Sequence, residues 1–182
     1  MVVCPLVEIE PIETGPVELD GYDWVVLTSA TGAEELRRRA VGRAAKVAAI
    51  GPATAEAWGD VDLVAAVSTQ EGLLAELPRP AGRVLFAGAE GARRLLVDEL
   101  GADFVALYRT KALRPDEPPH GDLVVVASPS AARTLADLDS SLPVVSIGPE
   151  TSAAARGAGL AVVAEAPSPS LDGLVSALAE AG

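Results

Sequence analysis

The sequence is poor in the residues that build metal centres and disulfides. Its 182 residues include one cysteine, Cys4, and one histidine, His120, so an internal disulfide is excluded and no metal cluster is expected. Aromatic residues make up only 3% of the chain, which argues against a surface that stacks nucleic-acid bases. With no run of 18 apolar residues and no N-terminal signal pattern, the sequence predicts no membrane span and a cytoplasmic location.

Positive charge is also scarce. Fourteen Lys and Arg residues stand against 26 Asp and Glu residues, giving a net charge of −12, which disfavours non-specific binding to nucleic acid. Hydrophobic residues make up 49% and charged residues 22%, as in ordinary globular proteins. The length allows one large domain or two small ones.

The familiar motifs of nucleotide binding and nucleophilic hydrolysis are missing. The segment Gly88 to Arg93 follows an expected strand but is neither a dinucleotide-binding fingerprint nor a Walker A loop. No Gly-x-Ser-x-Gly elbow, Cys–His pair or Ser-x-x-Lys motif occurs. We therefore expect no cofactor, and the acid–base side chains that remain are carboxylates and tyrosines.

Short apolar runs alternate with helix-forming stretches, which predicts an α/β fold with parallel sheets and crossover helices. The expected strands cover residues 25–27, 47–50, 63–65, 84–86, 123–126, 144–147 and 160–163. Because they are continuously apolar rather than alternating, we expect them to be buried on both faces. Helices are expected over residues 31–40, 53–58, 70–77, 90–100, 130–138, 150–157 and 170–180. A capping-box spacing marks Thr31 and Glu34, and Pro129 follows a candidate cap at Ser128.

An internal repeat divides the chain into two similar halves. The segments 23–29 and 47–54 match the segments 122–128 and 144–151, about 100 residues later. Both copies run on to a terminal helix that begins Glu71-Gly-Leu-Leu in one and Asp172-Gly-Leu-Val in the other. The repeat predicts two α/β units with a ligand site in a cleft between them.

The two copies differ in what precedes them. A strand–helix–strand unit over residues 83–108 comes before the second copy, whereas only the strand 2–9 comes before the first. The repeat therefore predicts that about twenty residues of strand and helix are missing at the N-terminus. Their absence would leave an open sheet position beside residues 123–126, which invites aggregation or marginal stability.

Candidate binding residues stand where strands end and helices begin. Each Ile-Gly-Pro-x-Thr segment directs helix N–H groups outward, and Thr54 and Thr151 add a hydroxyl there. Ser29 and Ser128 occupy the neighbouring strand-to-helix turns. These four residues are either anion-binding groups or ordinary helix caps, and both interpretations remain open.

Two further side chains have competing interpretations. Arg93 either binds a substrate carboxylate or is a solvated helix arginine. Tyr108 stands at the end of the strand 104–107, where its phenol either donates a proton into the cleft or only packs its ring. We interpret His120 as a solvated loop residue and Cys4 as a small hydrophobic residue.

In combination, several short segments resemble the uroporphyrinogen-III synthase family. They are Asp23-Trp-Val-Val-Leu-Thr-Ser29, Ala49-Ile-Gly-Pro-Ala-Thr-Ala55, Glu71-Gly-Leu-Leu74, Gly88 to Arg93 with Leu100-Gly-Ala102, Tyr108-Arg-Thr110, Ala127-Ser-Pro-Ser130 and Ile147-Gly-Pro-Glu-Thr151. Each is weak alone, but their order and spacing cover nearly the whole chain.

The resemblance implies two parallel-sheet α/β units joined by a two-stranded ladder. The ladder would comprise residues 1–14 and 105–114, with Val3 to Ile9 beside Val105 to Lys111. The inserted domain would cover 15–104, and the second domain 115–182 without its N-terminal βα element.

The resemblance also implies the reaction. The family closes hydroxymethylbilane into the tetrapyrrole ring with inversion of ring D, without metal or cofactor. It implies Tyr108 as general acid, and Ser29, Thr54, Ser128 and Thr151 as binders of the substrate's acetates and propionates, in a monomer. The alternative is a non-catalytic small-molecule-binding or regulatory module on the same fold.

Overall fold

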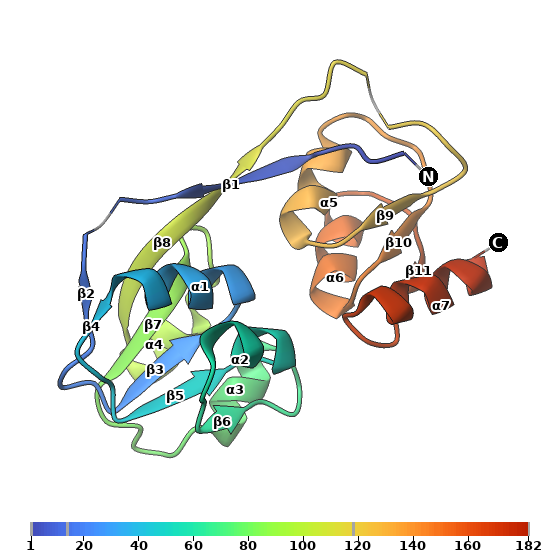
Figure 1. Cartoon of the computed structure of the whole chain (residues 1–182). Helices are drawn as coiled ribbons and strands as arrows, with labels where there is room; N and C mark the ends of the chain where they lie inside the picture. Colours follow the sequence, from blue (N-terminus) through green and yellow to red (C-terminus); the bar gives the residue numbers. More distant parts are fainter. Residues whose placement is uncertain (1, 14, 118, 182) are drawn as a thin grey trace. The chain divides into compact units, whose positions relative to one another are not determined.

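The computed structural model describes residues 2–13, 15–117 and 119–181. The chain divides by its internal contacts into two compact units (Figure 1). Residues 9–110 form one, called the inserted unit below, and residues 1–8 with 111–182 form the other, called the discontinuous unit. Both contain parallel strands followed by helices, so the predicted α/β class is confirmed.

The main sheet of the inserted unit has six strands in the order β1-β8-β7-β3-β5-β6. These are β1 (Val7–Pro11), β3 (Trp24–Leu27), β5 (Lys46–Ala49), β6 (Leu63–Val64), β7 (Val84–Ala89) and β8 (Asp103–Ala112). Strands β8, β7, β3, β5 and β6 pair in parallel. Every residue of β3 is buried, as expected for a continuously apolar strand covered on both faces. A small parallel pair, β2 (Val17–Glu18) with β4 (Ala40–Val41), lies apart from this sheet.

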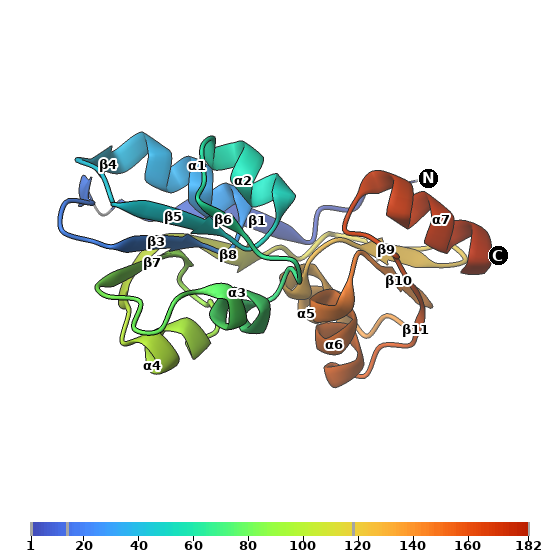
Figure 2. The same ribbon diagram turned by 90° about the horizontal axis from the view of Figure 1, so that it is seen from below.

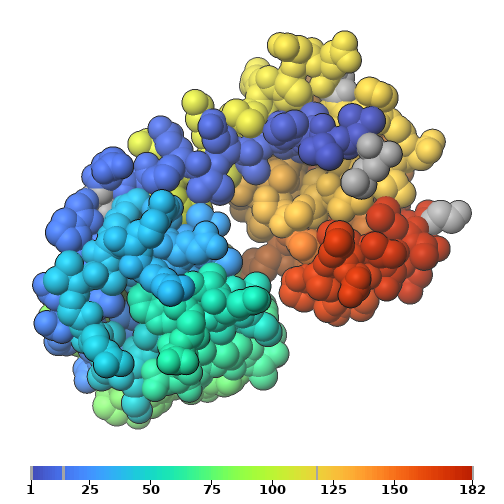
Figure 3. All heavy atoms as spheres, in the orientation of Figure 1, coloured from blue at the N-terminus to red at the C-terminus, as the bar shows by residue number. Residues whose placement is uncertain are grey.

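Strands β1 and β8 run antiparallel at one edge of that sheet. The N–H of Ile12 donates to the carbonyl of Leu107 at 2.9 Å, and the N–H of Leu113 donates to the carbonyl of Leu6 at 2.9 Å. The residue numbers of the partners rise on one strand as they fall on the other, which defines the antiparallel direction. Four of the five residues of β1 are exposed, and the space-filling view shows this strand at the surface (Figure 3).

Helices cover both faces of the inserted unit's sheet (Figure 2). On one face α1 (Ala30–Arg39) and α2 (Pro52–Trp58) pack on alternate strand residues such as Val25 and Leu85. On the other face α3 (Gln70–Glu76) and α4 (Leu95–Leu100) pack on the remaining alternate residues, including Val26 and Phe86. The alternation of side chains along each strand divides the core into these two layers.

The discontinuous unit has a smaller sheet of three parallel strands in the order β11-β10-β9. These are β9 (Val124–Val126), β10 (Val144–Ser146) and β11 (Val162–Glu165). One core cluster lies between this sheet and the helices α5 (Pro129–Ala136) and α6 (Pro149–Gly157), and it includes Leu6. A second cluster lies between the sheet and α7 (Leu171–Ala181) (Figure 2). Strand β11 alternates between half-buried and exposed residues, and Val64 of β6 and Val125 of β9 are also exposed. The prediction that these three strands are buried on both faces is therefore wrong.

Two helix starts differ from the sequence prediction. Helix α1 begins at Ala30 with Ser29 as its N-cap, so the capping box predicted at Thr31 does not form. Helix α4 begins at Leu95 rather than at residue 90. The N–H of Glu90 donates to the carbonyl of Tyr108 at 2.8 Å, and that of Ala92 to the carbonyl of Ala89 at 3.0 Å, which holds a turn there. The predicted cap at Ser128 with Pro129 in the first helical turn is confirmed.

The strand expected over residues 2–9 begins only at Val7, and the described residues before it form no strand. The repeated strands also have different neighbours. Strand β3 lies between β7 and β5, whereas β9 pairs only with β10 among the described strands. Val26 of β3 is fully buried, while Val125, its counterpart in the repeat, is 37% exposed.

Candidate active site at the start of helix α1

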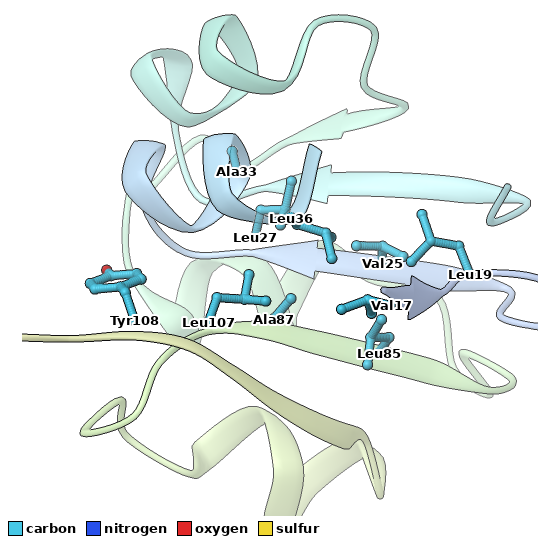
Figure 4. Close-up of a cluster of buried hydrophobic side chains, with 10 residues drawn as sticks. All are labelled: Val17, Leu19, Val25, Leu27, Ala33, Leu36, Leu85, Ala87, Leu107 and Tyr108. Atoms are coloured by element: carbon cyan, nitrogen blue, oxygen red, sulfur yellow. The ribbon is translucent and has the colours of Figure 1, made fainter. Parts of the chain in front are cut away.

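A hydrogen bond between Ser29 and Tyr108 joins the start of helix α1 to strand β8 of the inserted unit. Strand β8 runs from Asp103 to Ala112, so the prediction that Tyr108 stands at the end of its strand is wrong. The Oγ of Ser29 lies 2.9 Å from the hydroxyl oxygen of Tyr108. Ser29 lies two residues after the end of β3, and Tyr108 lies on β8. In the sheet, β7 lies between β3 and β8. Tyr108 is only 7% exposed and belongs to the same buried cluster as Leu27 and Leu107. In Figure 4 it lies at one end of this row of side chains.

The backbone of helix α1 holds the Ser29 hydroxyl in place. Ser29 has an extended backbone, and its Oγ accepts the N–H of Gly32 at 3.0 Å, as an N-cap does. A Cβ on residue 32 would lie 3.0 Å from that Oγ and 3.5 Å from the Cα of Gly88. Gly32 therefore leaves the space in which the cap and the end of β7 come together. Sequence reasoning missed this role, although the spacing Ser29-x-x-Gly32 was available as a signal.

The shared hydrogen bond leaves one hydroxyl proton unused. The Ser29 oxygen already accepts one hydrogen bond from Gly32, and either hydroxyl is able to donate the bond between Ser29 and Tyr108. When Ser29 donates, the phenolic proton of Tyr108 is left for another acceptor. The arrangement thus suits a tyrosine that gives a proton to a bound molecule.

The two Gly-Pro-x-Thr segments form matching helix starts in the two units. Gly51 is the N-cap of α2 and Gly148 that of α6, and neither has a side chain to cap the first N–H groups. Thr54 and Thr151 are buried, at 4% and 3% exposure. Thr54 shares the inserted unit with Ser29, whereas Thr151 belongs to the discontinuous unit.

Ser128 is a helix cap in the discontinuous unit. Its Oγ accepts the N–H of Ala131 at 3.1 Å, as Ser29 does in the other copy. A buried pair that the sequence analysis missed lies in the same unit, where the hydroxyls of Ser146 and Ser152 are 2.5 Å apart. Serine inside an otherwise apolar strand was the available signal. The substrate-binding roles of Thr54, Ser128 and Thr151 stay predictions.

Arg93 lies two residues before α4 rather than at its start. Its guanidinium donates to both carboxylate oxygens of Glu71, at 2.7 and 3.0 Å. These hydrogen bonds from Arg93 are the main cause that lowers the pKa of Glu71 to about 2. A substrate carboxylate would therefore have to compete with Glu71 for the Arg93 guanidinium. The role of Arg93 in substrate binding stays a prediction.

Two other classes of site, metal centres and membrane spans, find no support among the described residues. Over residues 2–13, 15–117 and 119–181, no group of three or more His, Cys, Asp or Glu side chains is arranged to hold a metal ion. Within the same ranges no helix combines the length and the apolar character that a bilayer crossing demands.

Comparison with known proteins assigns the family. The family model described as uroporphyrinogen-III synthase HemD matches residues 1–176 of this chain. The chain belongs to the uroporphyrinogen-III synthase family. This confirms the resemblance inferred from the short segments and assigns the chain to tetrapyrrole biosynthesis, with a small-molecule substrate. No curated protein matches the sequence significantly.

Solved structures of uroporphyrinogen-III synthases share the fold. The enzyme from Helicobacter pylori is 19% identical, with a TM-score of 0.61 over 96% of this chain and 90% of its own. A mutant enzyme from Thermus thermophilus is 15% identical, with a TM-score of 0.66 over 97% and 87%. Another structure of the Thermus thermophilus enzyme is 17% identical, with a TM-score of 0.51 over 95% and 87%.

Proposed function

We propose that this chain is a lyase that cyclises hydroxymethylbilane to uroporphyrinogen III with inversion of ring D, and that Tyr108 is its general acid. The hydrogen bond of 2.9 Å between Tyr108 and Ser29 is the observation that carries the proposal. This bond holds the Tyr108 phenol at the capped start of helix α1, and the chain belongs to the family of uroporphyrinogen-III synthases.

The proposed reaction needs one proton donor and a fixed substrate conformation. Tyr108 gives its proton to the terminal hydroxyl of the bilane, which leaves as water, and an electrophilic azafulvene remains. The substituted carbon of ring D attacks this centre to give a spiro intermediate. Fragmentation and re-closure then give the inverted ring, and the proton that ring D releases as it regains aromaticity restores the Tyr108 hydroxyl. Holding the flexible bilane in one geometry supplies much of the acceleration, with the proton transfer adding to it.

Ser29 assists Tyr108 in this proposal. Its hydroxyl donates to the phenolic oxygen, so it stabilises the negative charge that develops there as the proton leaves. The cap position keeps Ser29 oriented for this task, because its oxygen is held by the N–H of Gly32. The positive end of α1 adds to the same stabilisation.

The substrate carries acetates and propionates, whereas the chain has a net charge of −12. Local donors therefore have to hold it. We assign this role to the hydroxyls of Thr54, Ser128 and Thr151, to the helix N–H groups beside them and beside Ser29, and to Arg93 after exchange of its partner Glu71. The single hydroxyl proton of Ser29 is already donated to Tyr108 in this proposal, so Ser29 contributes to substrate binding through the helix start that it caps. The proposal includes a monomeric, cytoplasmic enzyme that needs no cofactor, and its single cysteine suits a reducing compartment.

The test uses the purified full chain with hydroxymethylbilane and no added metal or nucleotide. The products are oxidised to porphyrins, and their isomers are separated by chromatography. Predominance of the type III isomer supports the proposal, because spontaneous closure gives type I. Type I alone would instead favour a non-catalytic binding module. Tyr108→Phe serves as the matched variant.

A further inference from the structure

An ion pair with a buried carboxylate and a half-buried guanidinium lies towards the end of helix α1 opposite Ser29. Glu35 and Arg39 are one helical turn apart, and their carboxylate oxygen and guanidinium nitrogen are 2.6 Å from each other. Their side chains are 7% and 15% exposed. The exposed Arg38 pairs with the other carboxylate oxygen of Glu35. None of these residues has a place in the proposed chemistry.

The Arg39 guanidinium also bonds the two strands β1 and β8. It donates to the carbonyl of Ile12, the residue after β1, and to the carbonyl of Leu107 in β8 at 3.3 Å. Ile12 itself donates its N–H to the Leu107 carbonyl at 2.9 Å. One arginine thus fixes the antiparallel pair at the place where both segments belong to the inserted unit.

Leu107 is the residue directly before Tyr108, and Figure 4 shows the two side by side on β8. Both ends of helix α1 therefore bond to the dipeptide Leu107-Tyr108. Ser29 bonds the Tyr108 hydroxyl at the first turn, and Arg39 bonds the Leu107 carbonyl at the last. A shift of β8 along α1 would have to break both attachments.

The Leu107 carbonyl does not depend on Arg39 for a hydrogen bond. The Leu107 carbonyl already accepts the N–H of Ile12, so removal of Arg39 leaves it paired. A buried ion pair is also weak evidence for stability, because desolvation opposes the attraction between its charges. What the guanidinium adds here is a fixed geometry, since its planar donors reach Glu35 and both strands at once.

We propose that Arg39, held in place by Glu35, is a positioning residue that sets the Tyr108 hydroxyl against Ser29. This inference rests on the proposed function for its catalytic consequence, but the position of the Tyr108 ring is measurable without activity. Arg39 acts through the backbone of β8 and does not touch the substrate.

The kinetic test compares Arg39→Met with Arg38→Met, its matched control. Both variants remove a guanidinium that pairs with Glu35, but only Arg39 bonds β1 and β8. We expect Arg39→Met to lower kcat roughly tenfold or more with little change in KM, since small misplacements of reacting groups are costly. Arg38→Met should keep the wild-type kcat, and Arg39→Lys, which restores one donor group, should fall between them.

A double variant separates positioning from general damage. In the Tyr108→Phe background the hydroxyl that Arg39 positions is absent, so adding Arg39→Met should lower kcat by no more than about twofold further. An equal loss in both backgrounds would overturn the proposal, because it would show that Arg39 acts independently of Tyr108.

The structural readout uses 3-fluorotyrosine, because the chain has only two tyrosines, Tyr22 and Tyr108. Arg39→Met should shift or broaden the fluorine resonance of Tyr108 and leave that of Tyr22 unchanged. If Arg39→Met does not fold, Arg39→Lys and Glu35→Gln take its place.

An unchanged Tyr108 resonance in a folded variant contradicts the proposal. Failure of the wild type to make type III isomer contradicts the proposed function alone, while the fluorine spectrum still decides the positioning.

Discussion

At the residue scale, removal of the Tyr108 hydroxyl tests whether catalysis depends on proton donation or only on holding the substrate in one conformation. Tyr108→Phe keeps the ring within its buried cluster and removes only the oxygen bonded to Ser29. We expect kcat to fall by about 10²–10⁴-fold, the usual contribution of a general acid, with a small effect on KM. Steady-state kinetics with isomer analysis checks this. Tyr22→Phe is the control, since its hydroxyl bonds Asp103. Full activity of Tyr108→Phe would show that the site works by shaping the substrate alone.

Arg93 gives a second prediction at this scale. Its two hydrogen bonds lower the pKa of Glu71 to about 2. The ion pair therefore stabilises the folded state at pH values above the ordinary glutamate pKa of about 4.3. This contribution is lost as the pH falls from there towards 2. Both side chains are about half exposed, so the contribution is small. In Arg93→Met the pKa of Glu71 should rise towards its ordinary value, as followed by carbon-13 NMR of the carboxyl group.

Asp103 is the internal control for that titration. Hydrogen bonds from Tyr22 and then Arg83 lower its pKa, and Arg93→Met removes neither of them. A Glu71 pKa that stays near 2 in the variant would assign the effect to other donors, such as the Thr69 hydroxyl.

Sequence reasoning identified the candidate residues at this scale but not their partners. Ser29 and Tyr108 were singled out separately, because strand ends and helix starts are visible as local patterns. Their contact joins residues 79 positions apart, and no local pattern encodes such a distance. The same holds for Arg93 and Glu71, 22 positions apart. Glu35 and Arg39 look like an ordinary pair on a helix surface until the fold buries them.

At the scale of elements, the repeat explains a glycine shared by α3 and α7. A Cβ on Gly72 would lie 2.1 Å from the carbonyl oxygen of Val67, and one on Gly173 would lie 2.2 Å from that of Ser168. These contacts involve backbone and are far too close to be relieved by a side-chain rotation. Each copy of the repeat therefore needs glycine in the first turn of its last helix.

This predicts the effect of Gly173→Ala. The substitution should destabilise the protein by about 1–3 kcal/mol, although alanine favours helices more than glycine does. Urea unfolding followed by circular dichroism measures this difference. Gly157→Ala is the matched control, because a Cβ there meets nothing within 4 Å. A neutral or stabilising Gly173→Ala would mean that the turn before α7 shifts easily to make room.

The wrongly predicted helix starts have the same cause as the site contacts that the sequence did not predict, because both depend on residues far apart in the chain. Thr31 and Glu34 have the spacing of a capping box, but Ser29 has the extended backbone at the end of β3 and takes the cap. The start of α4 is delayed because Glu90 bonds Tyr108 on another strand. Strands β3 and β7 match the prediction because burial on both faces leaves a strong local pattern, whereas β6, β9 and β11 are only partly buried. Helix starts depend on which backbone groups distant elements already use.

At the scale of the whole molecule, the two units have unequal sheets. Among the described residues, the main sheet of the inserted unit has six strands, whereas the sheet of the discontinuous unit has three. Strand β9 has one neighbour among the described strands, and Val125 is 37% exposed where Val26 is buried. A smaller sheet with an unpaired edge opens at a lower free-energy cost, because fewer buried contacts are lost. The discontinuous unit should therefore unfold first.

The distribution of aromatic residues makes this order measurable. All the Trp, Tyr and Phe side chains lie between residues 22 and 108, within the inserted unit, so tryptophan fluorescence reports that unit alone. Far-ultraviolet circular dichroism reports the helices and strands of both units. We expect the urea transition by circular dichroism to begin at lower urea than the fluorescence transition, because part of the secondary structure is lost while Trp24 remains buried. Coincident transitions would show that the units unfold as one cooperative body, and that the open edge of β9 costs the discontinuous unit no measurable stability.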